Sequence, residues 1–461
     1  MKYAAEEMFR DFTLNGHWWV PSDPGGAAYG TLSYSVDRIK LRLDRAFTAD
    51  LNTAYAVGSV KFPVILGRAN DSSSVTVLKA FYWSSHGNEI DLLANGIVVG
   101  AHLDSARAVV REAVVGFSNL EEWTACQLVQ QSVGDGDEGV RFLATKDLKP
   151  NLQVSQLPCL KTLVLSTNLR VSQNRVETKL TNRSRFTLEF NQPATLETVT
   201  DSVRSLGNLL ALLIDEPVLP TNIRLMMQLE PSGPDVFANY AIPPRATLPK
   251  KKLEFEMLLP FNDLRQTNTA ETLFNNWFQK EQVLRPVYDL LLSTIYSPGQ
   301  YVQSTFLSLA QALESFHRRV YEGKYVSEKE YSSIKKAVID GIPVGIDEKL
   351  SARLRTMLEY GNELSLKSRL EYLFEGIRRD HLNNLSGTDD SRRFIRMLVG
   401  IRNYLTHYEG EKPLILESTV EMYNLNRRMT ALLMLLILKY LGLPENFVFV
   451  PIVGHLRLFV P

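Results

Sequence analysis

The stretch LFNNWFQKEQVLRPVYDLLLSTIY, Leu273 to Tyr296, marks the point at which the period of the apolar residues changes from two to 3.6. Just before it, Asn268 followed by Glu271 forms an N-terminal capping signature, and the helix breaker Ser-Pro-Gly follows it at Ser297. We therefore predict one long helix at this position and a boundary between two domains close to the start of that helix.

On the N-terminal side of this helix, short apolar runs of strand character follow one another over residues 39–259. They are IKLRLDRAF, VTVLKAFYW, GIVVGAHL, VRFLATKD, TLVLSTNLRV, RFTLEF, IRLMMQL and KLEFEMLL. We predict a single interrupting helix over residues 196–214 and an exposed, proline-rich loop over residues 231–249. The pattern favours a largely antiparallel β-sandwich or barrel.

On the C-terminal side the helical period continues to residue 441. Further helices are predicted over residues 301–321, 327–339, 347–360, 364–377, 389–408 and 414–441. Short connecting loops imply a compact bundle of antiparallel neighbours. The tail NFVFVPIVGHLRLF has strand character, and we predict that it pairs with a nearby sheet edge.

The predicted fold class is therefore α+β. A β-rich, sandwich-like or barrel-like N-terminal domain, residues 1–264, precedes an all-α helical bundle with a short C-terminal strand, residues 265–461. Because both halves contain enough apolar residues for a core, we expect the chain to fold throughout.

Composition limits the classes of partner. Lys plus Arg equals Asp plus Glu at 51 each, so no net positive field attracts nucleic acid from a distance, and any contact with RNA must come from a local patch. The start MKYAAEEMFRDF lacks the basic flank and apolar run of a secretory signal, and the longest apolar run is shorter than the ~20 residues of a membrane span. We expect a cytoplasmic protein that does not enter a membrane. Cys126 and Cys159 are expected to be buried free thiols, with a disulfide as the alternative.

One apparent cofactor-binding motif is surrounded by residues that exclude a phosphate-binding site. GDGDEG, residues 134–139, matches G-x-G-x-x-G, but a strand follows it and its acidic residues would repel a phosphate, so we predict a hairpin turn. A calcium site is the alternative, although the loop lacks the usual ligand spacing. The sequence also lacks the usual signatures of NTPases, zinc metalloproteases and α/β-hydrolases. We predict no cofactor and no metal.

The candidate site lies in GIRNYLTHYEG, residues 400–410, where Arg402 and His407 stand at a spacing that chance alone could supply. At 100° per residue, four polar side chains fall on one side of the predicted helix: Arg392, Arg396, Asn403 and His407. The opposite side is apolar, and we predict that it is buried: Phe394, Ile395, Leu398, Ile401 and Leu405.

The chemistry of this stripe suits phosphodiester cleavage. Asn403 precedes His407 by four residues, so its amide could hydrogen-bond the imidazole, and Arg402 could bend toward the same histidine. A histidine can accept or donate a proton near neutral pH, and an arginine offers fixed donors to phosphate oxygens. From geometry alone, a solvated face at the end of a helix is the alternative.

The R-N-x-x-x-H of RNYLTH resembles the signature of HEPN domains, whose active members are metal-independent endoribonucleases. The helix FLSLAQALESFHRRVYEG, which contains Glu314 and His317, resembles the first part of the HEPN domain of ApeA-type proteins. FTLNGHWWVPSDPGGAAYGTLSYSVDRIKLRLDRAF and VVGAHLDSARAVVREAVVGFSNLEEW resemble the β-rich N-terminal domain of the same proteins, which act in bacterial abortive infection against phage.

This resemblance implies a homodimer or higher homo-oligomer in which two motif helices line one cleft. The substrate would be RNA, either tRNA or another cellular or phage RNA, and no metal would be needed. Two copies of His407 would act as base and acid, Arg402 would stabilise the charged phosphorane, and Asn403 would orient a histidine or contact phosphate.

Four further residues are candidates for lesser roles. Glu314 and His317 could support catalysis, with a purely structural pair as the alternative. Arg392 and Arg396 could guide the RNA backbone, with a solvated helix face as the alternative.

The resemblance also implies a role for the N-terminal domain, which would sense infection, through a phage-encoded trigger, or restrain a toxic nuclease. A non-catalytic HEPN protein that dimerises or docks a partner is the alternative. A ligand-sensing module, in which the β-rich domain carries the main activity, is the third hypothesis.

Overall fold

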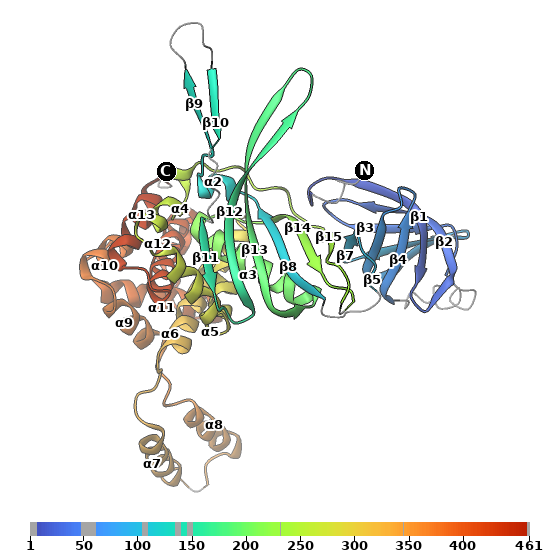
Figure 1. Ribbon diagram of the computed structural model, residues 1–461. Helices are drawn as coiled ribbons and strands as arrows, with labels where there is room; N and C mark the ends of the chain where they lie inside the picture. Colours follow the sequence, from blue (N-terminus) through green and yellow to red (C-terminus); the bar gives the residue numbers. More distant parts are fainter. Residues whose placement is uncertain are drawn as a thin grey trace. The chain divides into compact units, whose positions relative to one another are not determined.

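A computed structural model gives the fold of the chain (Figure 1). It describes residues 7–47, 61–103, 109–133, 140–144, 151–230, 232–343 and 345–458. By its contacts the chain separates into two compact units, Met1–Gln279 and Lys280–Pro461.

Thirteen strands of the first unit form one sheet in which every pair of neighbours is antiparallel. They are β1 (Phe12–Val20), β2 (Asp23–Tyr34), β3 (Ile39–Leu43), β4 (Lys61–Ala69), β5 (Ser74–His86), β6 (Glu89–Ala94), β7 (Gly96–Val99), β8 (Val110–Phe117), β11 (Leu152–Ser155), β12 (Leu160–Gln173), β13 (Thr178–Ala194), β14 (Pro220–Met227) and β15 (Val236–Ala241). A separate two-stranded sheet contains β9 (Val129–Val133) and β10 (Val140–Ala144).

Six of the strands close into a barrel in the order β5, β4, β1, β2, β3, β6. Closure occurs because β6 pairs with both β3 and β5, which satisfies strand edges that would otherwise be free. On β3 the alternate residues Ile39, Leu41 and Leu43 are fully buried, as a period of two requires. The predicted β-rich fold is confirmed, and its closed part is a barrel.

Beyond the barrel the sheet continues from β5 through β7, β15, β14, β8, β13 and β12 to β11. The helix α3 (Leu196–Ile214) packs on β8 and β13, and Thr195 caps its first turn by accepting a hydrogen bond from the Thr198 N–H. This confirms the predicted helix. The short helices α2 (Leu120–Thr124) and α4 (Phe261–Gln266) belong to the same unit.

The long helix that the opening stretch predicts is α5 (Ala270–Tyr296). Its first turns belong to the first unit, where the Trp277 indole N–H donates to the Ser205 carbonyl at 3.1 Å. Its later turns belong to the second unit. The chain therefore passes from one unit to the other within a continuous helix rather than through a loop.

One strand prediction and one loop prediction in this unit are wrong. KLEFEMLL forms η3 (Glu254–Glu256), a turn of 3₁₀ helix, because the Glu256 carboxylate accepts the Leu253 N–H at 2.7 Å and closes a local turn. The segment predicted as a loop contains β15, which pairs with β14 on one side and β7 on the other. Hydrogen bonds to a strand on each side stabilise β15, although its sequence has only a weak strand pattern. The turn predicted at 134–139 lies outside the described residues, as do the last three residues of VRFLATKD.

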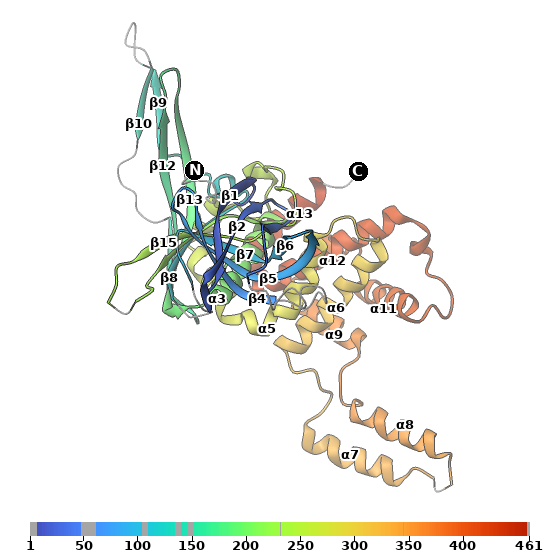
Figure 2. The same cartoon turned by 90° about the vertical axis from the view of Figure 1, so that its right-hand side faces the viewer.

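The second unit is helical (Figure 2). It contains α6 (Val302–Val320), α7 (Glu328–Asp340), α8 (Glu348–Glu359), α9 (Leu366–Glu375), α10 (Arg379–Ser386), α11 (Ser391–His407), η4 (Leu414–Glu417), α12 (Thr419–Tyr440) and α13 (Glu445–Leu458). The apolar helix α12 packs against α6, α10 and α13, and α6 packs in turn against α9 and α11.

The predicted helices of this unit are present with ends within two residues of the prediction, apart from residues 414–441. That segment is divided at Ser418, whose side chain caps α12 by accepting from the Glu421 N–H. The short α10 was not predicted. None of the described residues of α7 and α8 is buried, and these two helices form a separate hairpin rather than part of a compact bundle (Figures 1 and 2).

The strand predicted for the tail is also wrong, because the tail forms the helix α13. Val448, Ile452 and His455 are buried at helical spacing, and α13 packs against α12. Contact with a neighbouring helix therefore overrides the strand character of the valines and phenylalanines. No helix among the described residues is long and apolar enough to cross a membrane. Cys126 and Cys159 are half-buried and are not joined in a disulfide.

Candidate functional site

The helix α11 carries the candidate motif and is fixed by its apolar side. Its N-cap Asp390 accepts from the Arg393 N–H at 2.8 Å, and the helix packs against α6, α9 and α10. The five apolar residues predicted to face the bundle are all buried: Phe394, Ile395, Leu398, Ile401 and Leu405. The predicted orientation of the helix is therefore confirmed.

The opposite side of α11 is an exposed polar stripe, consisting of Arg392, Arg396, Asn403 and His407. His407 is the last residue of the helix, and Tyr408 follows it in the left-handed conformation with φ 54°. Because the chain leaves the helix immediately after His407, the imidazole lies at an exposed helix end.

The hydrogen bonds within the motif differ from the expected ones. Arg402 Nη1 donates to Asn403 Oδ1 at 3.2 Å, and no bond from Asn403 to the His407 imidazole occurs among the described side chains. The Thr406 hydroxyl donates to the Arg402 carbonyl at 2.7 Å, within the helix. Asn403 therefore holds the arginine rather than the histidine in a single chain.

A groove of about 400 Å³ adjoins the end of α11, and we call it the tyrosine groove. Its walls come from the start of α6, the end of α11 and the segment up to η4: Tyr301, Gln303, Ser304, Tyr404, Leu405, Tyr408, Lys412 and Leu416. The motif specifies none of these residues, although Tyr404 and Leu405 lie between Arg402 and His407. The one local signal was the pair of tyrosines, Tyr404 and Tyr408, on either side of His407.

Glu314 and His317 do not lie at this end of the helical unit. Gln303 and Ser304, in the first turn of α6, line the tyrosine groove, and His317 follows more than three turns later. A rise of 1.5 Å per residue places His317 ~20 Å further along the axis. Within one chain the structure therefore separates these two residues from His407.

His317 is fully buried, and Arg369 Nη1 lies 3.2 Å from its Nδ1. Since a guanidinium only donates, Nδ1 must accept, and the neutral ring carries its proton on Nε2. This Nε2 is buried without a hydrogen-bond partner among the described atoms. Burial, together with the positive charges of Arg369 and Arg318, lowers the pKa of His317 to about 4. His317 is therefore neutral at pH 7.

The neighbours of His317 complete a structural cluster. Arg318 donates to Glu314 Oε1 at 3.1 Å, one turn away on α6. Arg369 donates through Nε to the Leu364 carbonyl at 2.9 Å, and it lies so close to Gly323 that a Cβ there would be only 2.3 Å from Nη1. These contacts join α6 to α9 at the base of the α7–α8 hairpin.

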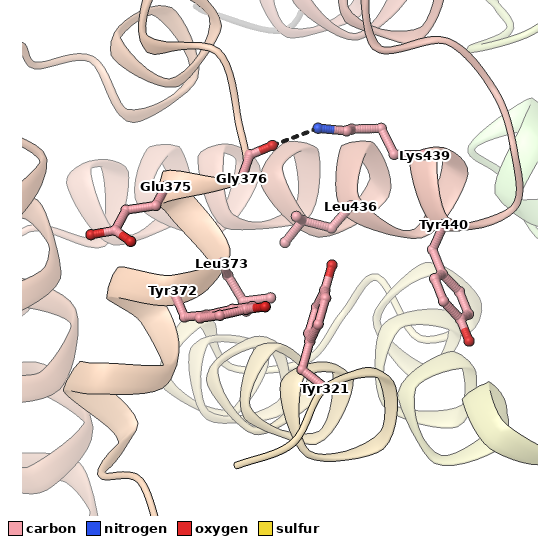
Figure 3. Close-up of a pocket in the computed structure, with 8 residues that line it drawn as sticks. All are labelled: Tyr321, Tyr372, Leu373, Glu375, Gly376, Leu436, Lys439 and Tyr440. Atoms are coloured by element: carbon pink, nitrogen blue, oxygen red, sulfur yellow. Dashed lines mark hydrogen bonds between the residues drawn. The ribbon is translucent and has the colours of Figure 1, made fainter. Parts of the chain in front are cut away.

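A second pocket, of about 500 Å³, borders this cluster (Figure 3). It is lined by Tyr321, Tyr372, Leu373, Glu375, Gly376, Leu436, Lys439 and Tyr440. The rings of Tyr321 and Tyr372 extend into it, whereas the Glu375 carboxylate points away from them (Figure 3). The Lys439 ammonium donates to the Gly376 carbonyl at 2.7 Å and also pairs with Glu445. Because that cation is already engaged, the pocket offers aromatic surface rather than groups for phosphate chemistry.

No set of three or more histidine, cysteine or acidic side chains is arranged to hold a metal among the residues that the structure describes. The described fold is a β-rich unit with a closed barrel, followed by a helical unit in which an R-x4-H motif ends an exposed polar stripe. This combination agrees with the two-domain HEPN class that the sequence resembles.

Comparison with protein families agrees with this class. The profile described as ApeA N-terminal domain 1 matches residues 13–277, more than half of the chain, and the profile described as Apea-like HEPN matches residues 307–447. The chain belongs to the ApeA-type HEPN family of defence proteins. Comparison with curated proteins and with solved structures gave no match.

Proposed function

We propose that the protein is an anti-phage endoribonuclease that cleaves RNA at a site shared by two copies of the chain. The observation that carries the proposal is the exposed stripe of α11, which ends in His407 while its apolar side is buried. Under the proposal, residues 265–461 form the nuclease domain, and residues 1–264 sense infection or restrain the nuclease.

The need for two copies follows from the histidines. Attack of the RNA 2′-hydroxyl on phosphorus breaks the bond to the 5′ oxygen and gives a 2′,3′-cyclic phosphate and a 5′-hydroxyl. This reaction needs a base for the attacking hydroxyl and an acid for the leaving oxygen. Of the four histidines in the described helical unit, only His407 is exposed, because His317, His381 and His455 are buried. A second His407, from a partner copy, supplies the missing group.

Arg402 and Asn403 have distinct roles in this proposal. The guanidinium of Arg402 gives one N–H to Asn403 and keeps its other donors for the phosphate oxygens, where charge develops in the transition state. Asn403 therefore positions the arginine, and its amide N–H groups can also contact phosphate. The metal-independent mechanism needs no further group.

The proposed partner is RNA, either tRNA or another cellular or phage RNA. With 51 basic and 51 acidic residues the protein has no net charge to attract it, so the contact must be local. Arg392 and Arg396 are exposed on the same stripe as His407, and we propose that they guide the RNA backbone.

The proposal is tested with purified full-length protein and cellular RNA in the presence of a chelator. We expect cleavage by the wild type, none by His407→Ala, and cleavage slowed by ~10² to 10³ by Arg402→Ala. His86→Ala, which changes an exposed histidine of the first unit, is the matched control and should cut normally. Sequencing of RNA ends from cells that express the wild type or His407→Ala identifies the substrate. Equal cutting by the wild type and both motif variants would exclude this site.

The α7–α8 hairpin favours a second candidate function, a non-catalytic HEPN protein that docks a partner. Its exposed apolar residues include Ile334, Val338, Leu350 and Met357, and none of its described helical residues is buried. Under this alternative, phage protection survives the Arg402 and His407 substitutions but is lost when Leu350 and Met357 are changed to serine. Loss of protection in the motif variants alone would favour the nuclease.

A further inference from the structure

We propose that the tyrosine groove binds an unpaired nucleobase of the RNA, on the nucleotide next to the bond that is cut. This inference rests on the proposed function, and it assigns the substrate class as single-stranded RNA. The groove is lined by residues that the motif does not include.

Two aromatic side chains of the groove are open to solvent. Tyr301 is 84% exposed and Tyr408 is 71% exposed, while Tyr404 packs against Tyr408 with ring centroids 5.7 Å apart. Because both rings line one groove, they form a contiguous exposed surface, and such a surface often marks a binding site. Stacking on aromatic side chains is the usual way in which proteins hold unpaired bases.

The backbone conformation of Tyr408 also supports the proposal. Its φ of 54° lies in the left-handed region, where the residue after a helix is usually glycine. A tyrosine here costs conformational energy, and backbone strain of this type is concentrated at functional sites. The Tyr408 N–H bonds to the Tyr404 carbonyl at 2.6 Å, so the helix end fixes the backbone that carries the exposed ring.

The polar groups of the groove suit a nucleotide. Lys412 contributes a cation, and none of the eight described residues that line the groove is acidic, although Glu409 and Glu411 lie in the same loop. Gln303 and Ser304 offer donors and acceptors to the edge of a base. They lie in the first turn of α6, where the side chain of the N-cap residue Tyr301 makes no capping bond.

The position and size of the groove decide which nucleotide it holds. His407 and Tyr408 are consecutive, with Cα atoms about 3.8 Å apart, so the groove and the proposed catalytic residue share the same end of α11. A volume of about 400 Å³ accommodates one nucleoside but not a duplex. A base inside a duplex is stacked and paired, and it could not enter. Unpaired loops, such as those of a folded RNA, therefore fit.

The experiment measures binding of a fluorescent single-stranded RNA, and of the same sequence as a duplex, by fluorescence anisotropy. All proteins carry His407→Ala so that the RNA stays intact. We expect Tyr408→Ala to weaken single-strand binding by about 5- to 150-fold, the usual loss of one stacked base. Tyr408→Phe keeps the ring and should bind within about twofold. Tyr360→Ala changes a tyrosine of the α7–α8 hairpin that is 67% exposed, and it should bind like the parent.

Three results would overturn the inference. The first is equal single-strand binding by Tyr408→Ala and its parent. The second is an equal loss of duplex binding, which would show that no unpaired base is read. The third is dissociation of the oligomer by Tyr408→Ala with RNA binding unchanged, which would make the groove a contact between subunits. Failure of the proposed function is a separate result, because the wild type would then not cut RNA at all.

Discussion

His407 and His317 lie on α11 and α6, two helices that pack against each other, yet their surroundings are opposite. His407 is exposed at a helix end, whereas His317 is fully buried, bonded to Arg369, and has a pKa lowered to about 4. Under the proposed function, the same residue type therefore serves proton transfer at one position and packing at the other. Burial and neighbouring charge decide between these roles, and a sequence motif contains no information about burial or about neighbouring charge.

The largest expected effect is on RNA cleavage, and it distinguishes His407 from His317. His407→Ala removes both copies of the proposed acid and base, each worth ~10² to 10⁴ in rate, so RNA cleavage should become undetectable. The thermal midpoint should change little, because the side chain is exposed. Cleavage rates and melting curves on the same preparations test this. A variant that melts much earlier than the wild type would mean that the loss came from unfolding.

Arg402 should show the next largest effect. Arg402→Ala is expected to slow cleavage by ~10² to 10³, as for removal of a donor to a developing negative charge. Arg402→Lys should not restore the rate, because an ammonium lacks the planar fork that bonds two phosphate oxygens. The ratio of kcat to KM under single-turnover conditions is the measurement. Full activity of the lysine variant would show that charge alone is needed.

Arg369 should affect stability and not the chemical step. It is 1% exposed and bonds to both His317 and the Leu364 carbonyl, so Arg369→Ala should lower the free energy of unfolding of the helical unit by about 3 to 5 kcal/mol. Urea unfolding followed by the helical signal measures this. Arg319→Ala, on the exposed side of α6, is the control. A loss below about 1 kcal/mol would contradict the structural role.

The smallest expected effect is a pH dependence that belongs to His317. The unfolded chain binds a proton on this residue below its ordinary pKa of 6.5, whereas the folded chain binds it only near pH 4. Stability should therefore fall as the pH is lowered from about 6.5 to 4, by about 3 kcal/mol in total, and this contribution should change no further below pH 4. His317→Gln keeps an acceptor for Arg369 without a titrating ring. Urea midpoints across this range should show a weaker slope in the variant, and an identical slope would assign the effect to other groups.

Much of the helical unit could be predicted from the sequence because its signals are local. Ser327 and Asp347 cap α7 and α8 as their residue types predict, each by accepting a backbone N–H three residues later. The buried face of α11 followed from a period of 3.6. The contacts among its polar residues could not be predicted, because the Arg402 side chain could bend toward either Asn403 or His407.

The errors share a different cause. The tail and KLEFEMLL both have strand-like composition, but neither forms a strand: one packs on α12, and the other closes a turn through Glu256. In contrast, β15 has a weak pattern and becomes a strand because β14 and β7 lie on its two sides. Strand formation needs a partner, and the partner is set by residues far away in the chain.

The sequence by itself determined the resemblance of both halves to one family, the change of period near residue 270, most helix ends of the second unit, and the buried and exposed faces of α11. The last three of these features depend on residues within about one turn of each other. The tertiary structure alone decided the closure of the barrel, the burial of His317, and the groove that joins Tyr301 to Tyr408. Each of these depends on residues 47 or more positions apart that packing brings together, and no local pattern specifies such contacts.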